Sequence, residues 1–207
     1  MLRLDHVVYA VPDLDEAAVR FRETFGLDST EGGRHERWGT ANRIVPLGDQ
    51  YVELVAAVDE TAAARTGFGR GVLERASGGG GWFTIAAVAE DLDAEAGRLG
   101  LEIGFGSRTR PDGEILRWRS AGLDDPRREP WMPFFLAWDS KDELHPGRAR
   151  AGHGVRAQGI TWVEVGGDAG RLRQWLGGEE LRIRVIDGEP GIRRVAVGTL
   201  EAELVIE

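Results

Sequence analysis

The chain has 207 residues, of which 42% are hydrophobic and 29% charged, and this composition excludes a disordered or collagen-like protein. A net charge of −9 disfavours nucleic acid and anionic membranes as partners, and the absence of cysteine excludes disulfides, thiolate nucleophiles and cysteine-ligated metals. Lys141 is the only lysine, so no lysine Schiff base is expected. No apolar run is long enough to cross a membrane, and Asp5 and His6 interrupt what would be the core of a signal peptide. We therefore expect a cytoplasmic protein.

The first predicted elements follow one another within 58 residues. Residues 6–11 form a β-rich run, and Asp13 and Glu16 have the spacing of a capping box at the start of a helix. Gly26 suits the left-handed position that ends a helix. Strands are expected over residues 34–39, 41–47 and 50–58, with a turn at 48–49. This unit therefore has the order β-α-β-β-β.

The same order of elements recurs twice. Asp13, Asp91 and Asp168 each stand between a β-rich run and a helical pattern, 78 and 77 residues apart. The second unit has strands near 82–88, 102–107, 114–119 and 131–138 and a helix at 91–99. The third has strands at 160–165, 181–186, 192–198 and 200–206 and a helix at 168–176. We predict an α+β fold in which sheets curl around a centre and helices lie outside.

Two joints separate these units. The predicted modules are residues 1–58, 82–138 and the divergent 158–207, with linkers at 59–81 and 139–157. The first linker opens with an alanine-rich helical pattern and ends in four glycines, and the second is polar and rich in Gly, Arg and His. We expect the modules to pack as one domain.

Several motifs together resemble one known family. They are the run LDHVVYAVPDLD, then Gly32-Gly33-Arg34-His35, Gly39-Thr40-Ala41-Asn42-Arg43 and Tyr51-Val52-Glu53-Leu54, with later echoes in Pro133-Phe134-Phe135, Trp138 and His145-Pro146-Gly147. In these residues the chain resembles the glyoxalase-like branch of the vicinal oxygen chelate superfamily. The resemblance implies paired βαβββ modules whose sheets form a half-open barrel. It also implies a divalent metal held by His or Glu on the first and last strands of each module, where it would bind two neighbouring substrate oxygens.

His6 and Glu53 occupy the first-strand and last-strand ligand positions that the resemblance implies. On strand alternation alone, His6 shares a face with Leu4, Val8 and Ala10, and Glu53 lies within an apolar run. A buried carboxylate needs a partner. His6 is therefore either a metal ligand or a core histidine bonded to a backbone carbonyl. Glu53 is either a ligand or the partner of an arginine at position 34, 37 or 43.

The second module departs from the full metal pattern. Phe83 or Thr84 stands where a second ligand histidine is expected, and the last strand offers only aromatic side chains. Three residues are candidates to fill the gap: His145 in its His-Pro-Gly motif, His35 after two glycines, and Glu203, whose local context repeats that of Glu53. The predicted metal ligands are His6, Glu53 and His145, and oxygen and nitrogen donors suit Zn, Mn, Fe or Ni.

The lining of a pocket can also be predicted. Thr40 and Asn42 share one strand face, and consecutive antiparallel strands would bring Asn42 near Glu53. The alternative is an edge strand with a solvated polar face. We further predict substrate contacts from His35, Trp118 and Trp138, although burial in the core is the alternative for the tryptophans.

Two hypotheses of function follow. The first is a metal-assisted lyase or isomerase that acts on a small oxygen-bearing molecule, with Glu53 and His6 as catalytic groups. The second is a metal-free protein that binds a small molecule in the same cavity. No nucleotide cofactor is expected, because the glycine-rich residues 67–71 lack a βαβ context. Three units leave one without a partner, so the barrel closes either within one chain or across a homodimer.

Overall fold

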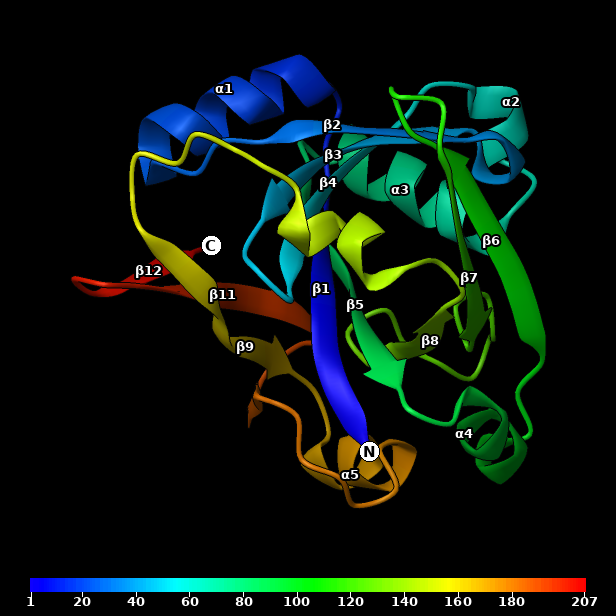
Figure 1. Ribbon diagram of the computed structural model, residues 1–207. Coiled ribbons are helices and arrows are strands. Elements are labelled where there is room, and N and C mark those ends of the chain that lie inside the picture. The colour runs from blue at the N-terminus through cyan, green and yellow to red at the C-terminus, as the bar shows by residue number, and fades with distance from the viewer.

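The first two units build one barrel, and the third forms a separate sheet on its side. Figure 1 presents the computed structural model, which describes residues 1–207. The barrel strands are β1 Leu2–Ala10, β2 Thr30–His35, β3 Thr40–Pro46, β4 Tyr51–Ala57, β5 Gly81–Ala89, β6 Ile103–Thr109, β7 Ile115–Ala121 and β8 Phe134–Trp138. Their order around the barrel is β1-β4-β3-β2-β6-β7-β8-β5, and the single pair Arg34–Thr109 joins β2 to β6. The predicted α+β fold with curled sheets and outer helices is confirmed, and the barrel closes within one chain.

The helices begin and end where the capping residues predict. The three repeated helices are α1 Leu14–Phe25, α4 Leu92–Leu99 and α5 Ala169–Trp175. The side chains of Asp13, Asp91 and Asp168 each accept hydrogen bonds from backbone N–H groups of the first helical turn, which otherwise lack partners. Gly26 ends α1 with a φ of 66°, in the left-handed region that glycine adopts without strain.

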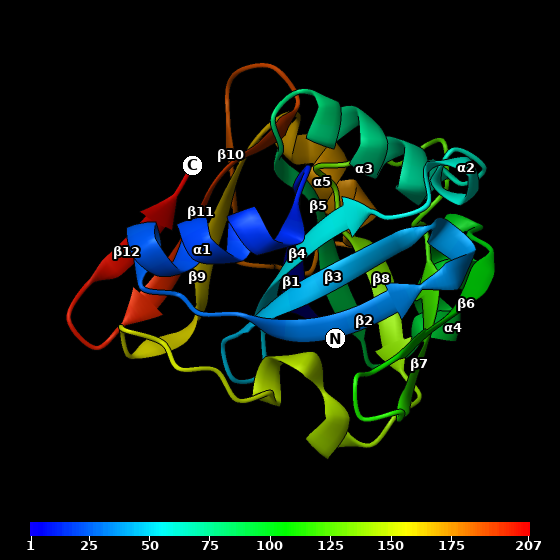
Figure 2. The same cartoon turned by 90° about the horizontal axis from the view of Figure 1, so that it is seen from above.

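The segment between the first two units packs against the inward-facing side chains of the barrel. It contains α2 Glu60–Ala63 and α3 Gly67–Ser77, and α3 packs against β4 and β5 (Figure 2). Phe68 and Val72 of α3 join a buried cluster with Val8 and Val55, whose side chains point into the barrel. The expected linker is therefore part of the barrel core.

The third unit has the same element order but a different sheet. Its strands are β9 Ala157–Gly166, β10 Ile183–Ile186, β11 Gly191–Thr199 and β12 Glu203–Ile206, in the order β10-β9-β11-β12. The first strand, β9, runs parallel to the second strand of its unit, whereas β1 and β5 run parallel to the fourth strands of theirs. The sheet packs on the outer side of the barrel, where Val163 and Val195 share a core with Val7 and Ile85 (Figure 1).

The second linker, residues 139–157, crosses the barrel, and we call it the strap. It contains two short 3-10 turns, Asp142–Leu144 and Pro146–Arg148. The backbone N–H of Gly48 donates to the carbonyl of Gly147 at 3.0 Å, which ties the strap to the turn between β3 and β4. This contact holds His145 against the start of β1. None of the helices is long and apolar enough to span a membrane.

Candidate active site

The barrel encloses a small cavity lined by both of its halves. Its volume is about 490 Å3, counting the open space at its mouth. The lining residues are His6, His35, Trp38, Asn42, Tyr51, Glu53, Phe68, Arg108, Trp118, Leu123, Phe134, Leu136 and Trp138. A wall that is mainly apolar with a few convergent polar groups is typical of sites for small molecules.

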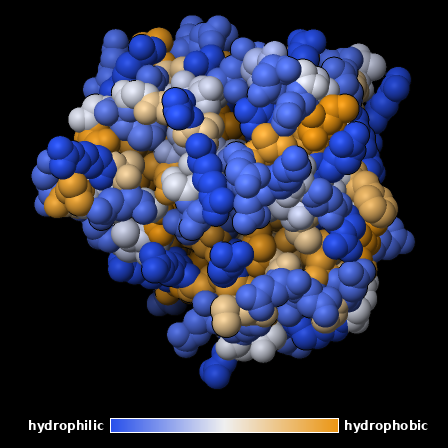
Figure 3. Space-filling model, in the orientation of Figure 1, coloured by the Kyte–Doolittle hydropathy of each residue, from blue (hydrophilic) through white to orange (hydrophobic).

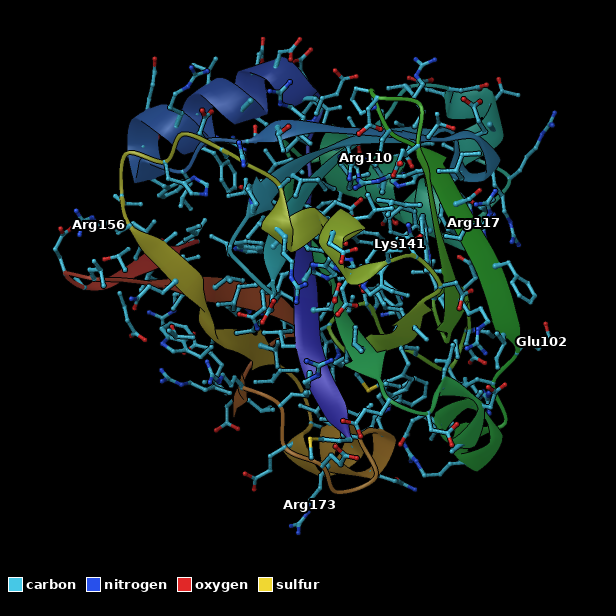
Figure 4. The ribbon with its side chains drawn as sticks, in the orientation of Figure 1. Glu102, Arg110, Arg117, Lys141, Arg156 and Arg173 are labelled. Carbon is cyan, nitrogen blue, oxygen red and sulfur yellow. The ribbon has the colours of Figure 1, made fainter.

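Buried ionisable groups gather at this cavity. The buried acids, bases and histidines of the chain are Asp5, His6, His35, Glu53, Arg108 and Glu164. All except Glu164, which pairs with Arg194 in the other sheet, line the cavity or contact a residue that does. Elsewhere charged side chains lie outside, as Glu102, Arg156 and Arg173 do at the rim of the molecule in Figure 4. Because burial of charge is unfavourable, such a cluster marks a candidate functional site.

A β-bulge determines on which face of β1 the His6 side chain lies. The pairing of β1 with β5 passes from Leu4–Ala87 directly to His6–Ala86, so Asp5 has no partner in β5. A bulge changes the face on which the following side chains lie. Leu4 consequently packs in the outer core while His6 lines the cavity, and the predicted shared face of these two residues is wrong.

Asp5 accepts hydrogen bonds from three side chains. Its Oδ2 lies 2.7 Å from His6 Nδ1, and its Oδ1 lies 3.0 Å from His145 Nε2 and accepts from Trp138 Nε1 at 3.2 Å. Burial raises the pKa of the Asp5 carboxyl, but the hydrogen bonds from His145 and His6 outweigh burial and hold that pKa well below its usual range. Asp5 is therefore a buried carboxylate.

This network assigns the protons on both imidazole rings. The backbone N–H of Gly147 donates to His145 Nδ1, so the proton of the neutral His145 ring is on Nε2 and is donated to Asp5. Asp5 can only accept, so His6 carries a proton on Nδ1. The other nitrogen of His6, Nε2, faces Glu53 Oε2 at 3.6 Å.

The His6 ring is further held by an aromatic contact. It stacks on the ring of Tyr51, with centroids 4.4 Å apart and an interplanar angle of 20°. Burial raises the pKa of the Tyr51 phenol well above its usual value, and the charges of Asp5 and Glu53 raise it further. Tyr51 thus stays neutral beside the cluster and helps to fix the plane of the imidazole.

Glu53 is bound to an amide that also binds an arginine. Asn42 Nδ2 donates to Glu53 Oε1 at 2.5 Å, and Arg108 Nη1 donates to Asn42 Oδ1 at 2.9 Å. Asn42 therefore lies between the carboxylate and the guanidinium. A Cβ atom on Gly32 would overlap Asn42 Oδ1 and crowd Arg108 Nη1, so a residue without a side chain is required there.

His35 is a neutral member of the cluster. Its Nδ1 lies 3.0 Å from Thr40 Oγ1, and its Nε2 lies 4.0 Å from Glu53 Oε1. Burial lowers the pKa of His35 to about 4; Glu53 acts in the opposite direction, and Arg108 adds to the lowering. The ring is consequently uncharged near pH 7.

Aromatic side chains form the rest of the cavity wall. Trp118 and Trp138 lie on paired positions of β7 and β8, with ring centroids 5.7 Å apart. Trp38 stacks on Trp118 at 6.0 Å, and the β6 residue beside Trp118 is Gly106, where a Cβ atom would overlap the indole ring. These contacting rings therefore give the cavity an apolar, aromatic wall.

The predicted site residues occupy distinct places. Thr40 contacts His35, and Asn42 contacts Glu53, the arrangement that the strand order predicts. The predicted ligands His6 and Glu53 lie together, but both ring nitrogens of His145 are engaged by Asp5 and Gly147, so His145 stands behind His6. No arginine from the first module pairs with Glu53, and Glu203 accepts a hydrogen bond from Trp162 in the other sheet.

Four further positions of the candidate site could not be predicted from the sequence. Asp5 precedes a bulge, which no local pattern reveals, and Trp38 lies in a short 3-10 turn. Phe68 reaches the cavity from the expected linker. Arg108 lies in an arginine-rich hairpin whose pattern is typical of a solvated surface. It becomes buried because β6 pairs with β2.

The residues present do not fit a divalent metal centre. No group of three or more His, Cys, Asp or Glu side chains is arranged to hold a metal ion. Ala86 and Phe134 face His6 from the second half of the barrel, and neither side chain can bind a metal ion. The buried Arg108 cation lines the same cavity and would repel a dication.

Comparison with known proteins places this geometry in a family. Residues 4–180 match the family of glyoxalase-like domains, so the chain belongs to that family, within the vicinal oxygen chelate superfamily. No curated protein matches the sequence.

Solved structures were compared with this chain, and one of them shares its fold along the whole chain. A hypothetical protein from Staphylococcus aureus is similar over 100% of this chain and 99% of its own, with 17% identity and a TM-score of 0.73. Methylmalonyl-CoA epimerase from Mycobacterium tuberculosis has 21% identity over 68% of this chain and 89% of its own, with a TM-score of 0.47. A methylmalonyl-CoA epimerase from Streptomyces coelicolor has 21% identity over 67% of this chain and 98% of its own, with a TM-score of 0.48. The similarity to the Staphylococcus aureus protein includes the additional sheet of β9 to β12.

Proposed function

We propose that this protein is a proton-transfer enzyme of the isomerase or lyase type that acts on a small oxygen-bearing molecule. One observation carries the proposal. His6 Nε2 and Glu53 Oε2 lie 3.6 Å apart on the wall of a buried cavity, and Asp5 holds the far side of His6. An acid and a base positioned this closely can exchange a proton after each turnover.

The proposed cycle uses one proton on this pair. Glu53 Oε2 removes a proton from a carbon next to a substrate carbonyl, while the imidazolium of His6 is stabilised by the adjacent Asp5 carboxylate. The His6 Nε2–H then protonates the substrate at its second position, which leaves His6 neutral and Glu53 protonated. Transfer of that proton from Glu53 to His6 restores the starting state without a net change in charge or oxidation state.

The cavity supplies the electrostatic part of the reaction. Removal of the proton places negative charge on the carbonyl oxygen of the substrate. Arg108 is a buried cation on the same wall, and aromatic side chains surround it. A preorganised cation in such surroundings stabilises a developing oxyanion far more than it would in water.

The metal-assisted version of this function finds less support. The donor set lacks a third ligand, and Arg108 is a cation in the place where positive charge is needed. The proposed steps therefore depend only on side chains of this chain.

A second candidate function is sequestration of a small molecule without reaction. It is favoured by the apolar and aromatic character of most of the lining and by the lack of polar groups on the β5 and β8 positions that face His6. In this case Glu53 and His6 would serve to orient the ligand.

Hydrogen–deuterium exchange separates the two functions. The protein is incubated in D2O with a panel of small 2-oxo acids, diketones and hydroxyketones, and the loss of C–H signals is followed by 1H NMR. We expect exchange of at least one compound, lowered by about 100-fold or more in Glu53→Gln because a general base contributes 10²–10⁴-fold. The matched control is Glu164→Gln, a buried strand glutamate outside the cavity. Tight binding with no exchange in any compound would favour sequestration.

A further inference from the structure

One buried arginine lacks the partners that burial demands. Arg108 is the one buried arginine of the chain, and even the half-buried Arg128 donates hydrogen bonds to the carbonyls of Gly122, Leu123 and Met132 and to the hydroxyl of Thr84. Arg108, only 6% exposed, makes one hydrogen bond, from Nη1 to Asn42, and forms no ion pair with a carboxylate. A buried unpaired cation is costly, so a partner for Arg108 is missing from the chain.

The free part of Arg108 has the geometry of a carboxylate receptor. Nε is buried without any acceptor, and Nη2 also makes no hydrogen bond. These two N–H groups form one edge of the planar guanidinium, which binds both oxygens of a carboxylate through two parallel hydrogen bonds. The carboxylate within the cavity, Glu53, is bound instead by Asn42, and that amide separates it from Arg108.

A second unpaired donor lies on the same cavity. Trp38 Nε1 and Arg108 Nε are the two buried side-chain nitrogen or oxygen atoms of the chain that have no hydrogen-bond partner. Buried polar groups are otherwise paired in folded proteins, and exceptions require an explanation. Both residues line the cavity, so its wall carries two N–H donors that no group of the protein satisfies.

The other side chains of the cavity wall indicate what the uncharged part of such a ligand is. Trp118, Trp138, Phe68 and Phe134 offer ring surfaces for an apolar group. The neutral ring of His35 adds no charge. The chemistry of the wall is therefore that of a flat apolar group with one anionic end.

We infer that the cavity takes a small monocarboxylate with a flat, apolar body, its carboxylate on the free edge of Arg108 and its body against the aromatic side chains of the wall. The inference rests on the proposed function in that it assigns a substrate class to the same site. A carbon next to the carboxylate or to an adjoining carbonyl would then lie within the cavity that Glu53 and His6 line.

The test is equilibrium binding of matched acids and amides. Phenylacetate, cinnamate and benzoate are each titrated into the protein by calorimetry, and their neutral amides serve as matched ligands of the same shape. We expect at least one acid to bind more tightly than its amide by about 10-fold to 150-fold, the range for hydrogen bonds to a charged group. Equal affinities of acid and amide, or no binding of any acid at millimolar concentration, would overturn the inference.

Substitutions test whether Arg108 and Trp38 bind the acid. Arg108→Gln should remove the preference for acid over amide, and Trp38→Phe, which keeps the ring but lacks the donor, should weaken acid binding by roughly 2-fold to 10-fold. The control is Trp131→Phe, because that indole is buried in the outer core and already donates to Glu129. Far-UV circular dichroism checks the fold, and if Arg108→Gln does not fold, Arg108→Lys and Trp38→Phe carry the test. Unchanged acid affinity in the folded variants would contradict the assignment.

The failure of this inference can be told apart from failure of the proposed function. Binding needs no chemistry, so Glu53→Gln should still bind the acid while losing deuterium exchange. Exchange that persists in Glu53→Gln with the acid preference intact would refute the proposed function alone. Exchange that requires Glu53 but shows no preference for acids would refute the substrate class alone.

Discussion

Asp5→Asn is the substitution that most directly tests how the site is held together. Asp5 is 2% exposed and accepts from His6, His145 and Trp138. An asparagine of the same shape keeps one acceptor oxygen, but the charge that strengthens all three hydrogen bonds is lost. Since a hydrogen bond to a charged group contributes about 1 kcal/mol more than a neutral one, we expect the free energy of unfolding to fall by about 3 kcal/mol. The measurement is urea unfolding at neutral pH.

The same substitution should change the proton on His6. The amide NH2 of asparagine would face Nδ1, so the neutral ring would carry its proton on Nε2 and could not accept there the proton that Glu53 returns in the proposed cycle. Deuterium exchange of the substrate should then fall by about 100-fold or more, and 15N NMR of the His6 ring reports the tautomer. The control is Asp91→Asn at an exposed helix N-cap, where asparagine caps equally well. An unchanged tautomer with normal exchange would refute the role assigned to Asp5.

Three further predictions address stability and metal content. Burial lowers the pKa of His35 to about 4, so the unfolded chain binds more protons between pH 4 and 6.5, and stability should fall by up to about 3 kcal/mol as pH drops through that window. Urea titrations should show this dependence diminished in His35→Gln, and equal slopes would contradict it. Gly32→Ala should lower the free energy of unfolding by about 1.5–3 kcal/mol by displacing Asn42, whereas Gly97→Ala, with open space at its Cβ, should not destabilise; equal effects would contradict the packing argument. Elemental analysis after loading with Zn, Mn, Fe or Ni should find no near-stoichiometric metal, and bound metal that disappears in His6→Ala would show that the site does hold a cation.

Local sequence patterns determined most of the secondary structure. Asp13, Asp91 and Asp168 mark the helix starts because a capping side chain acts within its own turn, on N–H groups two or three residues away. The α+β order and the curled sheets follow from these signals and from the repeats between them. The contact of Asn42 with Glu53 was equally predictable, since a short turn forces two consecutive strands into register.

Tertiary structure alone decided the charge and the shape of the site. Arg108 comes from the second half of the barrel and reaches Asn42 only because β2 and β6 meet at one residue pair. His145 reaches Asp5 across 140 positions of the chain, and the bulge at Asp5 moves Leu4 to the other face. The pairing of the third sheet likewise departs from the pattern that its element order suggests.

The physical reason is the range of the interactions involved. Caps, turns and alternation are settled among residues a few positions apart, so the amino-acid sequence encodes them directly. Closure of a barrel depends on the packing of many strands at once, and it brings together groups such as Arg108 and Glu53 that share no local pattern. The sequence by itself therefore determined the elements and half of the site, and the closed barrel supplied the buried cation and the second layer behind His6.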